Sequence, residues 1–236
     1  MTKSISHQDQ QNIWEKEHAE PFSLLQMDSE EGSSGVVKFL DWLKDKKIDF
    51  RSLKAIELGC GKGRNVIWLA KQGFHSTGID FSRIAVDEAK KRATRVGVEK
   101  QTEFYYHDAT TFWNFPDNSF DIVIDCFATT DIEDAKGRMF AASEMVRILK
   151  PGGYLLAYLL SPQDEYHAQT ILKSPATEEN AFIHPKTGKF EKTFDLEEIK
   201  EMYKGVKLIE HERVAKVATF FEKKYNCLHH WCVFQK

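Results

Sequence analysis

Residues 54–65 read Lys54-Ala55-Ile56-Glu57-Leu58-Gly59-Cys60-Gly61-Lys62-Gly63-Arg64-Asn65, an apolar strand that runs into three alternating glycines. A strand that ends in this way and restarts as a helix leaves no side chain over the crest of the turn, so a ligand can approach the bare backbone. The following helix directs its free N–H groups and the positive end of its dipole toward that ligand. The stretch therefore predicts a ligand-binding turn at the edge of an α/β sheet.

The acid before the first glycine and the glycine spacing indicate which ligand binds. Glu57 would lie at the carboxyl end of the strand, where a carboxylate repels phosphate but suits an ammonium or sulfonium group. The dinucleotide fingerprint is G-x-G-x-x-G/A, and here the third glycine comes one residue early, with Arg64 in the next position. Both features favour S-adenosylmethionine over a dinucleotide. A tight turn that binds no ligand is the alternative.

Four more motifs follow the glycine turn in order. They are Phe74-His75-Ser76-Thr77-Gly78-Ile79-Asp80, His107-Asp108-Ala109-Thr110, Asp117-Asn118-Ser119-Phe120-Asp121-Ile122-Val123-Ile124-Asp125 and Arg147-Ile148-Leu149-Lys150-Pro151-Gly152-Gly153. Together with residues 57–63 they resemble the motifs of the class I (Rossmann-like) S-adenosylmethionine-dependent methyltransferases, of the small-molecule type. The resemblance covers residues 50–160 well and the last third of the chain in outline.

The resemblance implies that the cofactor is S-adenosyl-L-methionine and that the product is S-adenosyl-L-homocysteine. It implies a cofactor site made of Glu57, Gly59, Cys60, Gly61, Gly63, Asn65, Asp80, Phe81, Asp108, Ala109 and Asp125. In this site Asp80 would accept hydrogen bonds from the ribose hydroxyls, since the alternative role of helix cap is already available to Ser82. Asp108 would accept from the adenine amine, or else form a turn.

Ala109, Phe81 and Asn65 also belong to the predicted cofactor site, and two of them have two interpretations. Ala109 would leave room for the purine and offer its backbone N–H to a ring nitrogen. Phe81 would pack either on the adenine face or in the core. Asn65 begins the helix and, on an alternative interpretation, also reaches the methionine carboxylate.

Apolar and helical segments alternate along the chain. We expect helices at 8–20 and 35–47, then strands at 54–58, 74–79, 102–106, 120–126 and 153–160 with helices at 64–72, 82–96 and 133–149 between them, then a helix at 195–203 and strands at 206–217 and 228–234. Such alternation predicts an α/β fold, a doubly wound and mostly parallel seven-stranded sheet with helices on both faces. The resemblance adds that the last strand is antiparallel.

We predict a single domain over residues 1–236 with four parts. These are an N-terminal helical cap (1–50), a cofactor-binding core (51–160), a lid with a small hairpin (161–195), and a C-terminal helix with a strand pair (196–236). The lid leaves the carboxyl end of the fifth strand, so we expect it to hang over the mouth of the site. Segments in that position usually carry specificity.

Composition narrows the partners. The 236 residues are 42% hydrophobic, enough for one domain with a sizeable core, and the formal net charge of −3 offers no field for collecting nucleic acid. We find no run long and apolar enough for a signal peptide or a membrane span. The four cysteines do not form zinc-ligand pairs, so we expect no metal and a cytoplasmic protein with reduced thiols, either a monomer or a homodimer.

The expected reaction is in-line displacement at the sulfonium methyl. We expect a small-molecule acceptor, because the N-P-P-Y/F motif of amino-directed DNA enzymes is absent and Asp125-Cys126-Phe127-Ala128 occupies its position. No catalytic residue is assigned, and Asp131 and His184 are candidates for a proton-handling role. Candidate acceptor contacts are Trp14, His18, Cys126 and Asp131. The alternative function is a non-catalytic cofactor-binding or scaffold protein with the same fold, and the sequence does not identify the acceptor.

Overall fold

The computed structural model describes residues 3–20 and 29–236, so residues 1–2 and 21–28 of the predicted cap lie outside the described residues. One sheet has the strand order β3-β2-β1-β4-β5-β9-β8. Its strands are β1 (Lys54–Leu58), β2 (His75–Asp80), β3 (Thr102–Tyr106), β4 (Phe120–Cys126), β5 (Leu149–Leu160), β8 (Lys207–Phe220) and β9 (Lys223–Gln235). The strands β1 to β5 are mutually parallel, whereas β9 runs antiparallel to both of its neighbours. The predicted seven-stranded sheet with an antiparallel last strand is therefore confirmed.

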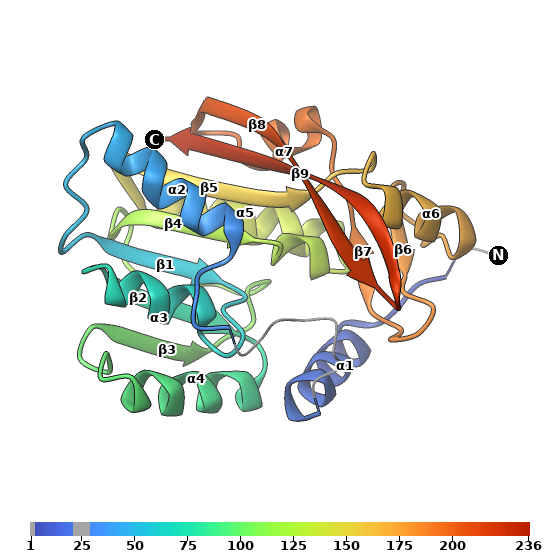
Figure 1. Ribbon diagram of the computed structural model, residues 1–236, viewed down its shortest axis with the longest axis horizontal. Helices are drawn as coiled ribbons and strands as arrows, with labels where there is room; N and C mark the ends of the chain where they lie inside the picture. Colours follow the sequence, from blue (N-terminus) through green and yellow to red (C-terminus); the bar gives the residue numbers. More distant parts are fainter. Residues whose placement is uncertain (1–2, 21–28) are drawn as a thin grey trace.

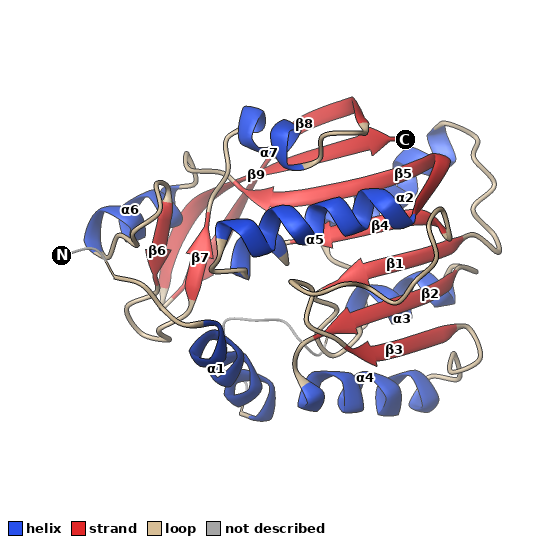
Figure 2. Ribbon diagram, turned by 180° about the vertical axis from the view of Figure 1, so that it is seen from behind, coloured by secondary structure: helices blue, strands red, loops and turns tan. Residues whose placement is uncertain are grey.

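Helices cover both faces of this sheet. The described helices of the whole chain are α1 (His7–Ala19), α2 (Ser34–Asp45), α3 (Arg64–Lys71), α4 (Arg83–Arg95), α5 (Ala135–Ile148), α6 (Glu165–Lys173) and α7 (Leu196–Met202), with a 3-10 turn η1 (Thr129–Asp131). The α2 and α3 side chains pack on one face, and α5 and α7 pack on the other (Figures 1 and 2). The fold is doubly wound, as predicted. Within the described residues, no helix has the length and apolar character needed to cross a bilayer.

The two helices of the predicted cap have different positions. The apolar stripe of α2 (Val36, Phe39, Leu40 and Leu43) is buried against the sheet, so α2 belongs to the core. By contrast, α1 lies beyond the carboxyl ends of the strands (Figure 1). Its buried Gln10 donates to the carbonyls of Asp131 and Phe190 and accepts from the Phe190 N–H at 2.9 Å. Only α1 acts as a cap over the strand ends.

The sheet extends further than the pattern predicts. The strand β5 begins at Leu149 rather than at residue 153, because Leu149 already pairs with Phe120 across an irregularity. The pairing of β8 with β9 continues to Phe220 and Lys223, while β9 leaves β5 at His229. Residues 214–228 therefore form a two-stranded ribbon that projects past the sheet. The predicted strands ended at residue 217 and began at residue 228, because Glu222-Lys223-Lys224 interrupts the apolar pattern at the tip of this ribbon.

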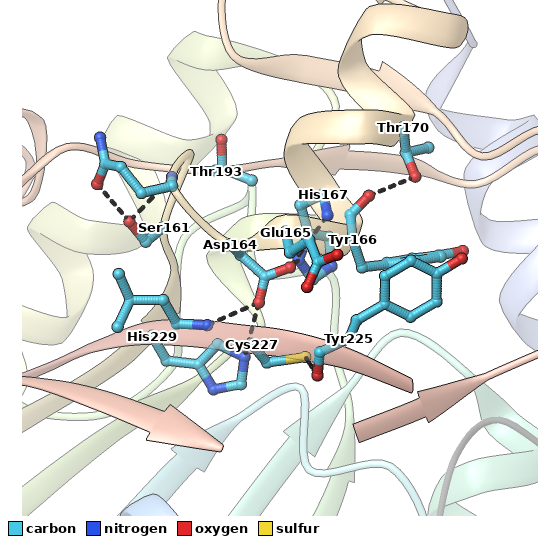
Figure 3. Close-up of polar contacts among 12 residues, drawn as sticks. Ser161, Asp164, Glu165, Tyr166, His167, Thr170, Thr193, Tyr225, Cys227 and His229 are labelled. Carbon is cyan, nitrogen blue, oxygen red and sulfur yellow. Dashed lines mark hydrogen bonds and ion pairs between the residues drawn. The ribbon is translucent and has the colours of Figure 1, made fainter. Parts of the chain in front are cut away.

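The predicted lid contains the expected hairpin and a helix that was not predicted. The strands β6 (Ala181–Ile183) and β7 (Phe190–Lys192) pair antiparallel. The short helix α6 precedes them, and Asp164 caps it by accepting from the N–H of His167. The lid is fastened to the ribbon, because Asp164 also accepts from the Leu228 N–H at 2.8 Å and Tyr166 stacks on Phe220 at 4.3 Å. Figure 3 shows Asp164 and Tyr166 of the lid beside Tyr225 and Cys227 of the ribbon.

Candidate active site

A cavity of about 280 Å³ opens at the carboxyl ends of β1, β2 and β4, below α1. This is the edge at which ligands bind in doubly wound sheets. Thirteen of the predicted site residues line it, namely Trp14, His18, Glu57, Gly59, Cys60, Gly61, Asn65, Asp80, Phe81, Asp108, Ala109, Cys126 and Asp131. The structure thus brings together the candidate cofactor residues and the candidate acceptor contacts.

The glycine turn owes its shape to close backbone approach. Gly59 has a φ of +62°, and a Cβ there would lie 2.7 Å from the Cβ of Ala128 on the opposite wall. Gly63 does not line the cavity. It has a φ of +78°, and a Cβ there would lie 2.9 Å from the ring of Phe104, so this glycine lets α3 pack on β3. The structure thus gives Gly63 a packing role, and its contact with the cofactor stays a prediction.

Glu57 is a buried carboxyl group with one unused oxygen. Its side chain accepts from the Nδ2 group of Asn65, while Oε2 has no hydrogen-bond partner among the described residues. Burial is the main cause that raises the pKa of Glu57 to about 8. A cationic group placed against Oε2 would satisfy the oxygen and favour the ionised form. The position therefore fits an ammonium or sulfonium ligand.

Asn65 is already committed on both sides of its amide. Its Oδ1 accepts from the backbone N–H of Ser33 at 2.7 Å, which ties the start of α2 to the glycine turn. Its Nδ2 donates to Glu57. Asn65 therefore orients the Glu57 carboxyl and lines the cavity at the same time.

Asp80 ends β2 with both carboxylate oxygens directed at backbone. Oδ2 accepts from the Gly61 N–H and Oδ1 accepts from the Ser82 N–H, each at 2.8 Å. Burial raises the pKa of Asp80 to about 6, against these two hydrogen bonds. Ser82 caps α4 through the N–H of Ala85, so the cap does not need Asp80. The Asp80 oxygens retain lone pairs that fit two vicinal hydroxyls.

Asp108 divides its two oxygens between a turn and the cavity. Oδ1 accepts from the N–H and the hydroxyl of Thr110, which realises the turn-forming alternative. Oδ2 lies 3.1 Å from Nε2 of His7 on α1. Phe81 and Ala109 line the cavity beside it, as the sequence analysis expects of an adenine pocket.

Asp125 is completely buried and is not among the residues that line the cavity, so its predicted contact with the cofactor stays a prediction. It accepts from the N–H groups of Ala128 and Thr129 and from the hydroxyls of Thr129 and Tyr203. These bonds brace the turn that follows β4. In that turn Phe127 has a φ of 68°, a strained value for a bulky side chain, and its ring packs against Tyr158 at 4.8 Å.

The acceptor candidates separate into two groups. Cys126 lines the cavity as a neutral thiol, because burial raises its pKa to about 12. His184 does not reach the cavity. Its Nδ1 accepts from the N–H of Thr187 within the hairpin turn, and its Nε2 contacts the Tyr166 hydroxyl at 2.7 Å. The structure gives His184 a part in shaping the lid, and its candidacy for catalysis stays a prediction.

Several lining residues escaped the sequence analysis. His7, His107, Phe127 and Glu133 all line the cavity. Nε2 of His107 is buried and has no partner in the described part of the chain, and His7 bridges Asp108 and Glu133. Only the Phe127 position carried a sequence signal, since it directly follows a predicted strand. The described residues contain no group of three His, Cys, Asp or Glu side chains arranged to hold a metal ion.

The fold and the cavity together indicate the class of ligand that this protein binds. A glycine turn, an orphaned carboxyl oxygen beside it and a buried acid at the end of the next strand form a site for a cationic nucleoside ligand in a doubly wound domain.

Comparison with known proteins finds one matching family model and several relatives of similar sequence. The family described as "Methyltransferase domain" matches residues 56–157. The sterol 24-C-methyltransferase ERG6A of Gibberella zeae is 36% identical over 115 residues, which are 48% of this chain and 29% of that protein. An uncharacterized protein of Haemophilus influenzae is 31% identical over 65% of this chain and 60% of its own length. The alignments thus span less than two thirds of either relative.

Solved structures share the fold over nearly the whole chain. A SAM-dependent methyltransferase of Methanosarcina mazei has a TM-score of 0.70 at 24% identity and covers 82% of this chain and 96% of its own. The 1,6-didemethyltoxoflavin-N1-methyltransferase of Burkholderia thailandensis, with bound S-adenosylhomocysteine, has a TM-score of 0.67 at 12% identity and covers 100% and 92%. Residues 56–157 thus match a methyltransferase domain, and the chain shares the fold of solved S-adenosylmethionine-dependent methyltransferases.

Proposed function

We propose that the protein transfers the methyl group of S-adenosylmethionine to a small-molecule acceptor. The observation that carries the proposal is the unpaired Oε2 of Glu57 beside a glycine turn too close-packed for side chains. S-adenosylmethionine, when bound, supplies a methyl carbon already activated by its sulfonium. The protein's task is then to align the acceptor and to exclude water.

The lining residues fit the parts of this cofactor. We assign Glu57 to its amino group, Asp80 to its ribose hydroxyls, and Oδ2 of Asp108 to its adenine amine, with Phe81 and Ala109 beside the base. Supporting this assignment, Glu57 and Asp80 are held by fixed hydrogen bonds from Asn65 and from backbone N–H groups. Positioning of this kind supplies about 7–11 kcal/mol of a transfer barrier.

The position of the cavity between two elements supports a small acceptor. The helix α1 and the turn after β4 both contribute lining residues, so the acceptor must fit between them. Relatives are named as sterol and demethylmenaquinone methyltransferases, and a structural neighbour acts on didemethyltoxoflavin, which makes small molecules the common theme of the names. All four cysteines are free thiols, which supports a cytoplasmic setting. We retain the prediction of a monomer or homodimer.

A non-catalytic scaffold is less well supported. Loss of catalysis is expected to leave a filled or mutated site, yet the cavity is open and the three acids Glu57, Asp80 and Asp108 all line it. No specific observation favours the scaffold over an enzyme.

Calorimetric titration of the purified protein with S-adenosylmethionine and S-adenosylhomocysteine tests the proposal. We expect both to bind with micromolar dissociation constants, and NAD to show no binding at the same concentrations. Absence of binding by both adenosyl ligands would overturn the proposal and leave the scaffold function. Binding of NAD would overturn the assignment of Glu57.

A further inference from the structure

Two polar atoms on the α1 side of the cavity await a partner. Nε1 of Trp14 and Nδ1 of His18 are buried, and neither has a hydrogen-bond partner within the described residues. An unsatisfied buried polar group costs about 1–3 kcal/mol, so a ligand that pairs with these atoms is favoured. His18 is only 6% exposed, and burial is the main cause that lowers its pKa to about 4. Its ring is therefore neutral at physiological pH.

Asp131 faces the same cavity from the turn after β4. Its backbone is fixed, because its N–H donates to Ala128 and its carbonyl accepts from Gln10. Its carboxyl group accepts no hydrogen bond from any described residue, although it lines the cavity. Burial raises the pKa of Asp131 well above its ordinary value, and the negative charge of Glu191 on β7 is the next largest cause. Asp131 is thus a partly exposed acid at the cavity with no hydrogen-bond donor among the described residues.

Glu191 is the second carboxyl group of this cluster. Burial also raises its pKa, against the positive charges of Lys189 and His167. Two carboxyl groups that repel each other titrate as a pair. Asp131, which lines the cavity, and Glu191, which lies outside its lining, therefore influence each other's proton.

The other charges around this pair neutralise one another. Nζ of Lys189 lies 2.8 Å from Glu17 on α1 and 4.1 Å from the centre of the Trp14 ring. On α6, Nδ1 of His167 lies 2.6 Å from Asp164; burial would raise the pKa of Asp164, but the hydrogen bond and charge of His167 hold it at about 2 (Figure 3).

The remaining charged neighbours are also paired. Glu133 contacts His7 at 2.9 Å, and Arg138 contacts Glu178. Asp125 is saturated by the turn that it braces. Nε2 of His167 lies 3.8 Å from Glu191. Glu191 thus has His167 as its partner, whereas Asp131 has no ion pair with any described residue.

We propose that the acceptor is a small polar molecule that presents an N–H or O–H group, and that Asp131 takes the proton of that group as the methyl is transferred. This rests on the proposed function. The nitrogen or oxygen lone pair forms the new bond to the methyl carbon, and the electrons of the breaking carbon–sulfur bond remain on sulfur, which becomes a neutral thioether. The proton moves to the Asp131 carboxylate. The Trp14 N–H donates to another polar atom of the acceptor.

Other acceptor classes match the site less well. An acceptor that arrives as an anion, such as a thiolate or a chalcogen oxyanion, would meet the Asp131 carboxyl group and a neutral His18 on this side of the cavity, although Lys62 and Arg64 also line it. An apolar alkene would leave Trp14, His18 and Asp131 without partners. A neutral acceptor that presents an N–H or O–H group gives these side chains hydrogen-bond partners.

Binding of matched probes to the S-adenosylhomocysteine complex tests the proposal. The probes are pyrazole with 1-methylpyrazole, and phenol with anisole, each followed by NMR at millimolar concentration. We expect at least one N–H or O–H probe to bind the wild-type complex about tenfold or more tightly than its methylated counterpart, the scale of one hydrogen bond to a charged group. Asp131→Asn should remove that preference, because the amide can donate to either probe's lone pair and no longer takes a proton.

The controls separate this proposal from the assignment of the cofactor. Asp41→Asn, a surface change on α2, should keep the preference, and Glu191→Gln should weaken it if Asp131→Asn fails to fold. Calorimetry with S-adenosylhomocysteine on the same samples comes first, since failure there overturns the proposed function. If that ligand binds but the protonated and methylated probes bind equally, or none binds, the N–H or O–H acceptor is overturned. The same holds if Asp131→Asn and Glu191→Gln both keep the preference.

Discussion

The two halves of the cavity are built in different ways. On the cofactor side, Glu57 and Asp80 lie at the ends of adjacent strands and pair with Asn65 and Gly61, which are 8 and 19 residues away along the chain. On the acceptor side, α1, the turn after β4 and the hairpin converge, and Gln10 bonds to Phe190 across 180 residues. Strand ends therefore fix the cofactor half locally, whereas the acceptor half exists only when distant segments have docked.

The largest expected effect breaks the cofactor half at its turn. Gly59→Ala would place a Cβ 2.7 Å from that of Ala128 at a positive φ, so we expect a loss of about 3 kcal/mol in cofactor binding, more than a hundredfold. The matched control is Gly97→Ala, which has a similar φ of +75° but open space around it. Calorimetry with S-adenosylhomocysteine should show normal affinity for the control. Equal losses in the two variants would refute the close approach as the cause.

The next effect undocks the acceptor half alone. Gln10→Ala leaves the N–H and carbonyl of Phe190 and the carbonyl of Asp131 unpaired, which should destabilise the docking of α1 by about 2–3 kcal/mol. Hydrogen exchange should accelerate in α1 and in β6–β7 but remain unchanged in β1 and β4. Gln8→Ala, at an exposed position on the same helix, serves as the control. Acceleration throughout the sheet would mean that the two halves are not separate units.

A third prediction uses the pH dependence of stability that Glu57 causes on the cofactor side. The folded protein holds the proton of Glu57 up to a pKa of about 8, mainly through burial, whereas an unfolded chain releases it near 4.5. The contribution of this group to stability is therefore full below pH 4.5 and is lost as the pH rises to 8.

Glu57→Gln should remove that loss. We expect the ligand-free variant to be more stable than wild type at pH 8 by about 1–3 kcal/mol, yet to bind S-adenosylhomocysteine at least about tenfold more weakly. Denaturant unfolding at pH 5 and pH 8 measures the first effect. Glu197→Gln, at an exposed position, should change neither quantity. A variant with wild-type affinity would argue against the contact between Glu57 and the amino group.

The smallest effect ranks the two acids of the cofactor half. Asp80→Ala should weaken S-adenosylmethionine binding at least tenfold, about 1.4 kcal/mol, because its buried carboxylate has no replacement. Asp108→Ala should cost only about threefold, since its side chain is 32% exposed and its loss is partly covered by water. The reverse order would exchange their assigned roles, and unchanged affinity in Asp80→Ala would exclude the ribose contact.

The sequence predicted the cofactor half well, because the chemistry there follows strand periodicity. The ends of β1 and β2 carry Glu57 and Asp80 where the pattern placed them. Asp125 satisfied the same pattern, yet it accepts four hydrogen bonds from the protein itself and is not among the residues that line the cavity. Nothing in the local spacing distinguishes an acid that braces a turn from one that contacts a ligand.

The acceptor half was predicted only in part. Trp14, His18 and Asp131 were identified, but Glu191 and Lys189 were not, because their environment depends on how the hairpin docks. His184 was selected for its place in the lid and proved to shape the hairpin turn. The helix α6 was missed because its nine residues are mostly polar and its packing partner, the ribbon, is contributed by residues more than 40 positions later.

The position of β9 has a consequence for the order in which the protein is assembled during synthesis. β9 lies between β5 and β8, and the ribbon that it forms with β8 anchors the lid through Leu228. Residues up to Leu160 leave the ribosome earlier and already contain the five parallel strands with the glycine turn. The nascent chain is thus able to form its adenosyl site before the acceptor site exists. Under the proposed function, early cofactor binding would then stabilise a folding intermediate that is not yet able to transfer the methyl group.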